Sequence, residues 1–335
     1  ATGCSSIWGN SSPSTPYTVN AKGQGPAWDN SLFEDNAEFG YGMLLAQKAI
    51  RDGLKTKVES VMANEKASEE VKAACKEWLD TFNVGATNGT ATDKLVAALE
   101  EIDCPTCKEI VKNKDFLAKK SQWVFGGDGW AYDIGFGGVD HVLASGKDIN
   151  IMVFDTEVYS NTGGQSSKAT KTGAVAQFAA GGKDVKKKDL AGIAMSYGYV
   201  YVAQICMGAD MAQTVKAISE AEAYPGPSLI IAYAPCINHG IKKGMSKAQT
   251  EEKLAVECGY WNNFRYNPAA EKKFTLDSKA PKMEGYQDFL KGEVRYLSLT
   301  MKNPERAKEL FARNEAEAKD RFEYLQKLVA LYGNE

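Results

Sequence analysis

The chain has 335 residues, with 40 Lys and Arg against 43 Asp and Glu, and 44% of its residues are hydrophobic. These values are typical of a globular protein of one large or two ordinary domains, and they exclude a disordered or fibrous chain. The net charge of −3 gives no support to a nucleic-acid surface. No apolar run is long enough to span a membrane. The N-terminus has no signal-peptide pattern and no initiating Met, so we expect a processed or cut chain.

The first third of the sequence divides into an irregular segment and a helical one. Residues 1–36 are rich in Gly, Ser, Pro and Asn with aromatic residues between them, which indicates a long loop that packs on another part of the protein. Residues 37–120 have the apolar spacing of helices, with Ser68 and Thr92 as expected N-caps.

After residue 120 the pattern becomes that of an α/β protein. Short apolar runs occupy residues 121–127, 148–155, 197–205 and 227–235. Gly-rich turns or helical stretches separate them, and residues 209–223 form a good crossover helix. The nearly continuous apolar strands predict a mostly parallel sheet with helices on both faces.

Beyond the sheet, residues 261–300 are mixed and polar, and one long helix is expected from Pro304 to about Tyr332. We therefore expect a domain over residues 1–260, with residues 37–120 as its helical part. A helical C-terminal extension would occupy residues 261–335.

Two strand ends carry residues suited to a bound phosphate. Asp128 lies in a Gly-Asp-Gly turn, where the glycines let backbone amides approach a phosphate. A carboxylate there would repel a phosphate unless a cation lies between them, and Mg²⁺ bridges such groups. The hydroxyl of Thr156 and the carbonyl of Val158, at the end of the next strand, could complete its oxygen ligands. Ligands of parallel sheets bind at this edge.

Other motifs are weaker. Residues 135–140 (GFGGVD) do not have the dinucleotide-binding spacing, and the chain has no P-loop, HExxH or GxSxG. The two histidines are too few for most imidazole metal sites: His141 is expected in a helix, and His239 follows a strand end without an obvious partner.

The seven cysteines are an odd number in a chain long enough to need no disulfides, which favours a reducing, cytoplasmic setting. Cys104 and Cys107 form a C-x-x-C motif between helical segments. The motif is either a set of cluster ligands or a pair of ordinary thiols at a helix end.

Residues 127–170, from GDGWAYD to SSKAT, resemble the thiamine-diphosphate and Mg²⁺ motif of the 2-oxoacid:ferredoxin oxidoreductases. Residues 7–43 look like the single-chain pyruvate:ferredoxin oxidoreductases, also called pyruvate synthases. The resemblance covers essentially the whole chain, which is similar to the C-terminal thiamine-diphosphate-binding domain of that longer enzyme.

The resemblance implies a thiamine-diphosphate-binding fold and a set of site residues. Mg²⁺ would be held by Asp128, Thr156 and Val158. Cys4 and Cys236 would ligate a [4Fe–4S] cluster whose other ligands lie before Ala1. Asn161 would contact the substrate. The implied cofactor-binding residues are Cys4, Gly127, Asp128, Gly129, Trp130, Thr156, Glu157, Val158, Tyr159, Ser160 and Asn161.

The implied reaction is the oxidative decarboxylation of pyruvate to acetyl-CoA and CO₂ in anaerobic metabolism, with electrons passing through [4Fe–4S] clusters to ferredoxin. The partners would be pyruvate, coenzyme A, ferredoxin and the remaining domains of a homodimeric enzyme, with no nucleic acid and no membrane. The catalytic Glu and the substrate-binding Arg would lie in those other domains, so the isolated chain is expected to be inactive.

Two alternatives stay open at this point. The chain could be a stand-alone β subunit of another 2-oxoacid:ferredoxin oxidoreductase, or a non-catalytic electron-transfer or assembly module. The sequence does not determine the 2-oxoacid, the oligomeric state, the ferredoxin docking face, or the roles of Cys104, Cys107 and residues 261–335.

Overall fold

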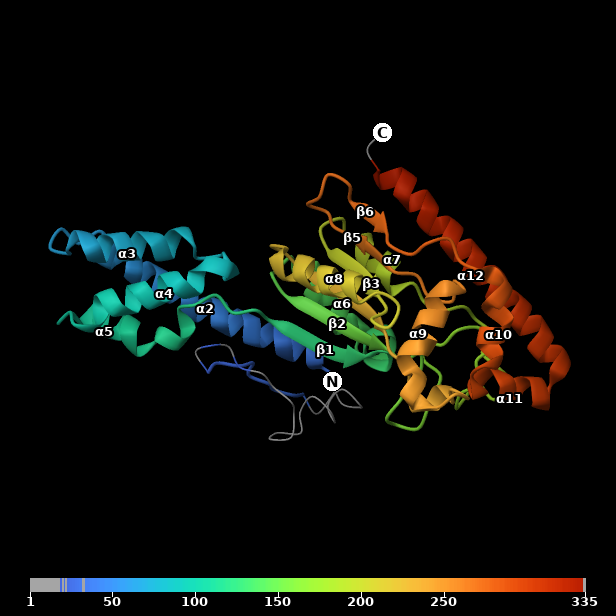
Figure 1. Cartoon of the computed structure of the whole chain (residues 1–335). Helices are drawn as coiled ribbons and strands as arrows, with labels where there is room; N and C mark the ends of the chain where they lie inside the picture. The colour runs from blue at the N-terminus through green and yellow to red at the C-terminus, as the bar shows by residue number, and fades with distance from the viewer. Residues whose placement is uncertain (1–18, 20, 22, 32–33, 334–335) are drawn as a thin grey trace. The chain divides into compact units, whose positions relative to one another are not determined.

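The computed structural model describes residues 19, 21, 23–31 and 34–333 (Figure 1). The chain divides into two compact units. Residues 1–39 and 123–335 make up the first, which we call the sheet unit, and residues 40–122 make up the second, the helical unit. The stretch 261–335, expected as an extension, is part of the sheet unit.

The sheet unit is built on six strands in the order β1-β2-β4-β3-β5-β6. The first four are parallel to their neighbours, as predicted, and β5 and β6 are added antiparallel at one edge. The strands are β1 (Trp123–Gly127), β2 (Asn150–Asp155), β3 (Tyr201–Ile205), β4 (Ser228–Tyr233), β5 (Phe264–Tyr266) and β6 (Phe274–Leu276). Gly127 pairs with Phe154, and Asp155 pairs with Tyr233, so β1, β2 and β4 end side by side.

Helices cover the sheet on both faces. On one face, Ala217 and Ala221 of α8 (Met211–Ala223) pack against Tyr201 and Ala203 of β3. Val202 points to the opposite face and is also fully buried, which confirms the prediction from the continuous apolar strands. The other helices of the unit are α6 (Phe136–Ala144), α7 (Leu190–Met195), α9 (Ala248–Glu257), α10 (Tyr286–Lys291) and α11 (Val294–Lys302), together with α12.

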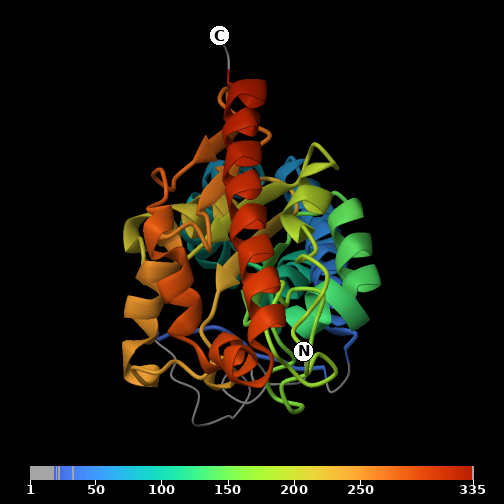
Figure 2. The ribbon, with the colours of Figure 1, turned by 90° about the vertical axis from the view of Figure 1, so that its right-hand side faces the viewer.

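The helix α12 (Pro304–Tyr332) is the long C-terminal helix predicted from the sequence, and Figure 2 shows it as one continuous rod. Pro304 occupies its first turn, and the Asn303 side chain caps it by accepting the amide of Arg306 at 3.1 Å. None of the helices in the described part of the chain combines the length and apolar character that crossing a bilayer requires.

The helical unit contains most of α2 (Asn36–Met62), with α3 (Glu69–Asp80), α4 (Gly85–Glu100) and α5 (Pro105–Lys112). Its core includes Trp78, Leu95 and Ile110, none of which exposes any surface. Ser68 caps α3 as predicted, accepting the amide of Val71 at 3.3 Å.

The predicted cap at Thr92 is wrong. Thr92 lies inside α4, where its hydroxyl donates to the Asn88 carbonyl at 2.8 Å. The helix begins earlier because the buried Asn88 side chain anchors its first turns, accepting hydrogen bonds from Arg51 at 3.1 Å and from the Lys119 amide at 2.7 Å. These partners are distant in sequence, so no local pattern indicates them.

Replacing Leu95 by Ala should lower the free energy of unfolding by about 2–5 kcal/mol, because it leaves a cavity in the core of the helical unit. Urea denaturation followed by circular dichroism measures this. The control is Lys94→Ala, whose side chain is 56% exposed and pairs with Glu77, and which should cost less than about 1 kcal/mol. Equal losses for the two variants would contradict the assignment of this core.

Candidate functional site

A cavity of about 440 Å³ lies beyond the carboxyl ends of β1, β2 and β4. Because parallel neighbours end at the same edge, the loops that follow them converge there. The lining residues are Glu34, Gly127, Asp128, Gly129, Trp130, Phe154, Thr156, Val158, Tyr159, Ser160, Asn161, Thr162, Ala234, Pro235, Cys236 and Ile237. The structure thus brings nearly all of the predicted site residues together. Cys4 lies outside the described residues, and Glu157 does not line the cavity.

The Thr156 hydroxyl contacts both of the other expected Mg²⁺ ligands. The hydroxyl oxygen of Thr156 lies 2.8 Å from Oδ1 of Asp128 and 3.0 Å from the carbonyl oxygen of Val158. A hydroxyl has one hydrogen, yet here it faces two oxygens that can act as acceptors. The site therefore has more oxygen atoms than hydrogens to join them. Such a group of oxygen atoms suits a hard cation such as Mg²⁺, which binds oxygen ligands.

The remaining surroundings of this cation site also fit Mg²⁺. Among the described residues, no group of three or more His, Cys, Asp or Glu side chains could hold a metal. Asp128 would therefore be the carboxylate ligand beside a hydroxyl and a carbonyl. Mg²⁺ characteristically binds proteins through one or two carboxylates and completes its shell with water and phosphate oxygens.

Asp128 is held in a setting that favours a nearby positive charge. Its carboxyl group is 1% exposed, and one oxygen accepts the Ser167 hydroxyl at 2.6 Å. Burial and then the charge of Asp155 raise the pKa of Asp128 to about 7, while hydrogen bonds from Ser167 and Thr156 oppose the rise. A divalent cation at this point would compensate the buried negative charge.

The glycines around Asp128 are required by close packing. A Cβ on Gly126 would lie 2.2 Å from the Trp130 ring, and one on Gly129 would lie 2.5 Å from the Tyr159 ring. At Gly127, which lines the cavity, nothing lies within 4 Å of an added Cβ. The turn therefore packs two aromatic rings against its backbone and leaves room for a ligand beside Gly127.

The loop after β2 reverses direction at Glu157. Its φ angle of 60° is left-handed, a conformation that costs a residue other than Gly about 1–2 kcal/mol. The reversal places the hydroxyl of Thr156 and the carbonyl of Val158 on the same side of the backbone, 3.0 Å apart. The cation site therefore depends on the conformation of Glu157.

The Glu157 side chain does not line the cavity, and the cofactor contact expected of this residue stays a prediction. It is fully buried, with Lys187 at 3.2 Å and Arg295 at 3.0 Å, and it accepts the Tyr260 hydroxyl. Lys187 also pairs with Asp155 at 2.6 Å. Burial alone would raise the pKa of Glu157, but the charges of Lys187 and Arg295 hold it well below its usual value. The buried carboxylate therefore holds the loop in place through its contacts in the protein interior.

His239 has a partner that the sequence did not reveal. Its Nε2 lies 2.6 Å from the carbonyl oxygen of Thr156, and its Nδ1 lies 3.8 Å from Oε1 of Glu293. The ring is completely buried, and burial followed by the charge of Arg295 lowers the pKa of His239 to about 3. The neutral ring thus carries its hydrogen on Nε2 and donates it to Thr156, a tautomer assigned from the geometry.

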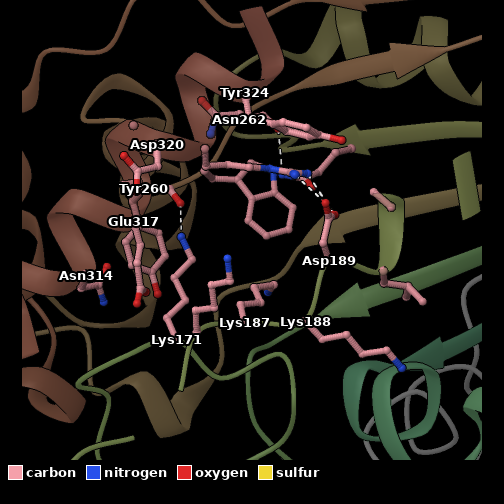
Figure 3. A pocket seen from close by; sticks show the side chains of 18 of the residues that line it. Lys171, Lys187, Lys188, Asp189, Tyr260, Asn262, Asn314, Glu317, Asp320 and Tyr324 are labelled. Carbon is pink, nitrogen blue, oxygen red and sulfur yellow. Dashed lines mark hydrogen bonds and ion pairs between the residues drawn. The ribbon is translucent and has the colours of Figure 1, made fainter. Parts of the chain in front are cut away.

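Residues from the C-terminal third contact the long segment that follows β2. Several of these residues line a second cavity, of about 430 Å³ (Figure 3). Lys171 donates to the Tyr260 carbonyl, and Asn314 of α12 donates to the Thr172 carbonyl at 2.5 Å. Arg321 of α12 makes a two-pronged ion pair with Asp189, at 2.5 and 3.0 Å. Residues 261–335 therefore brace the loop that carries the cation site.

The remaining predicted residues lie at the rim and wall of the first cavity. Asn161 is exposed at the rim, and the Ser160 carbonyl accepts the Asn238 side chain at 3.0 Å. Cys236 is a wall residue, 8% exposed, whose sulfur accepts the Asn238 amide at 3.4 Å. Cys104 and Cys107 belong to the helical unit and do not line this cavity.

Part of the sheet unit matches a known protein family. Residues 112–232 match the family described as "Thiamine pyrophosphate enzyme, C-terminal TPP binding domain"; thiamine pyrophosphate is another name for thiamine diphosphate. The match includes the strands β1 to β4 and the Asp128 and Thr156 loops. It confirms the predicted thiamine-diphosphate-binding fold.

Curated relatives with high sequence identity are named as pyruvate oxidoreductases. The chain is 55% identical to "Pyruvate-flavodoxin oxidoreductase" of Klebsiella pneumoniae, over 98% of this chain and 28% of that protein. It is 57% identical to "Pyruvate:ferredoxin oxidoreductase" of Moorella thermoacetica, over 98% of this chain and 29% of that protein. The predicted resemblance is confirmed, and the chain spans less than a third of the length of these relatives.

Two more distant similarities were found. The chain is 49% identical to the pyruvate dehydrogenase (NADP+) of Euglena gracilis, over 92% of this chain and 17% of that protein. A solved structure of a 2-oxoglutarate:ferredoxin oxidoreductase from Magnetococcus marinus aligns with 35% of this chain and 40% of that chain, with 24% identity and a TM-score of 0.32. The structural likeness is too weak to support an argument.

Replacing Arg295 by Met should lower the free energy of unfolding by about 3–5 kcal/mol, because it leaves the buried Glu157 and Glu293 carboxylates without their partner. Chemical denaturation followed by circular dichroism measures the loss. Arg306→Met is the matched control, since its surface ion pairs should contribute less than about 1 kcal/mol. If the two variants are equally stable, Arg295 does not brace the loop.

Proposed function

We propose that this chain is the cofactor-binding, C-terminal part of a pyruvate:ferredoxin oxidoreductase. The whole enzyme would oxidatively decarboxylate pyruvate to acetyl-CoA and CO₂ and pass the electrons to ferredoxin. The observation that carries the proposal is the contact of Asp128, Thr156 and Val158, within 3.0 Å, in a cavity of a chain that matches thiamine-diphosphate enzymes.

The cation site has a defined part in this function. Asp128, Thr156 and Val158 would hold Mg²⁺, which in turn would hold the diphosphate beside the open backbone of Gly127. Thiamine diphosphate, when bound, supplies the nucleophilic carbon and the electron sink that decarboxylation requires. The residues 127–130 and 156–161 would orient it, and Asn161 at the rim would hydrogen-bond the substrate carboxylate.

Cys236 would place an electron-transferring cluster beside the same cavity. It forms part of the wall, and together with Cys4 it would ligate a [4Fe–4S] cluster whose other ligands come from outside this chain. A cluster at that wall would lie close to the cofactor. A non-catalytic electron-transfer module would need the cysteines but not the cation site, so the site favours the enzyme.

The substrate and partners are inferred from the relatives. The relatives from Klebsiella, Moorella and Euglena are all named for pyruvate, whereas their names differ in the electron acceptor, which is flavodoxin, ferredoxin or NADP+. We infer pyruvate and coenzyme A as substrates, ferredoxin as the acceptor, and a homodimer in the cytoplasm. The catalytic Glu and the substrate-binding Arg would come from the remaining domains.

Replacing Asp128 by Asn should weaken Mg²⁺-dependent binding of thiamine diphosphate at least about tenfold, because the cation loses its charged ligand. Titration calorimetry with and without Mg²⁺ measures the affinity. Thr156→Ser should retain binding and Thr156→Val should lose it. Asp140→Asn is the control, since Asp140 accepts the Tyr197 hydroxyl at 2.7 Å outside the cavity. Unchanged affinity in Asp128→Asn would refute the proposed site.

The isolated 335-residue chain should not reduce a viologen dye in the presence of pyruvate and coenzyme A, because groups from other domains are required. The intact enzyme, assayed in parallel under anaerobic conditions, should do so. Robust turnover by the isolated chain would show that those domains are dispensable.

A further inference from the structure

The helical unit contains a pair of cysteines that the proposed function does not use. Cys104 is the N-cap residue of α5, and Pro105 occupies the first turn of that helix. Cys107 lies within the same first turn, so its side chain is on the same side of the helix as Cys104. The helix start is thus a C-x-x-C motif with both sulfurs at the positive end of the helix dipole.

The two thiols differ in access and face each other. Cys104 is partly exposed, whereas Cys107 is 2% exposed and packs in the core of the helical unit near Cys75. Cys107 follows Cys104 by three residues, so the two side chains lie one above the other in the first turn of the helix. A reagent in solution can therefore approach Cys104, and Cys107 lies within reach of the sulfur that would be modified.

The pKa values of the two thiols differ along with their exposure. Hydrogen bonds from the backbone and the thiol of Cys107 lower the pKa of Cys104, whereas burial raises the pKa of Cys107 to about 11. The neighbouring charges, Asp103 and Lys108, form an ion pair with each other at the surface. Cys104 is thus the thiol that ionises first.

A metal site is the weaker explanation of the motif. Among the residues that the structure describes, no group of three or more His, Cys, Asp or Glu side chains is placed to hold a metal. Cys75 is the nearby third cysteine, and its side chain is fully buried in the apolar core. Two sulfurs with unequal exposure at a helix start fit thiol–disulfide chemistry better.

We propose that Cys104 and Cys107 form a redox-active dithiol that reacts with disulfides, Cys104 as the attacking thiol and Cys107 as the resolving thiol. The Cys104 thiolate attacks one sulfur of a disulfide RSSR, forming a mixed disulfide and releasing RS⁻. Cys107 then gives its proton to solvent and attacks the Cys104 sulfur, which releases the second RS⁻. The dithiol loses two electrons, and RSSR is reduced to two thiols.

The first test follows alkylation of the intact, anaerobically prepared protein by iodoacetamide, with peptide mass spectrometry at each pH. The reaction at Cys104 should reach half its maximal rate below about pH 8.5, the ordinary value for cysteine. Cys206 and Cys258 are internal controls, because both are buried and should react slowly. A Cys104 midpoint at or above the ordinary value, or equal rates for the buried controls, would overturn the proposal.

The second test uses oxidised glutathione as the disulfide. The wild-type protein should form a Cys104–Cys107 disulfide, and the variant Cys107→Ser should instead accumulate a glutathione mixed disulfide at Cys104, at least about tenfold above wild type. Cys104→Ser should form neither. Absence of the internal disulfide in the folded wild-type protein contradicts the proposal, as does a bound zinc ion that protects both thiols until it is chelated.

Discussion

The proposed cation site depends on a carboxylate that does not line the cavity. Glu157 adopts a left-handed backbone conformation, and its buried side chain is held by Lys187, Arg295 and Tyr260. Those contacts fix the peptide units on either side of Glu157, so that the Thr156 hydroxyl and the Val158 carbonyl face Asp128 together. The strain of the backbone, about 1–2 kcal/mol, is small beside the cost of leaving a buried ion pair broken, about 3–5 kcal/mol. The ionic contacts therefore decide the conformation.

Residues 261–335 support both the edge of the sheet and the loop that contains Glu157. Without β5 and β6 the edge of the sheet beside β3 would be unpaired, and without Arg295 the buried carboxylates of Glu157 and Glu293 would each lose an ion-pair partner. His239 adds a further constraint by donating to the Thr156 carbonyl. The loop that lines the cavity is thus held by residues that lie outside the cavity.

Local sequence patterns predicted the parallel strands, the long C-terminal helix and the meeting of Asp128, Thr156 and Val158, because each depends on neighbouring residues or on the common edge of parallel strands. The role of Glu157 was not predicted. A buried Glu in a loop has no local signature, and its partners are far away in the chain, with Tyr260 at a separation of 103 residues. The strands β5 and β6 were missed because they are short and lie in a polar stretch. His239 and the start of α4 were misjudged for the same reason, since the partners of His239 and Asn88 come from distant segments.

The distance between Glu157 and its partners also has a consequence for synthesis on the ribosome. The strands β1 and β2 and their loop are made first, but Tyr260 and Arg295 follow only after most of the sheet unit has been translated. Until they emerge, the Glu157 carboxylate can pair with Lys187 but lacks Arg295 and the Tyr260 hydroxyl. The loop that carries Thr156 and Val158 can therefore reach its final set of contacts only after residue 295 has been translated.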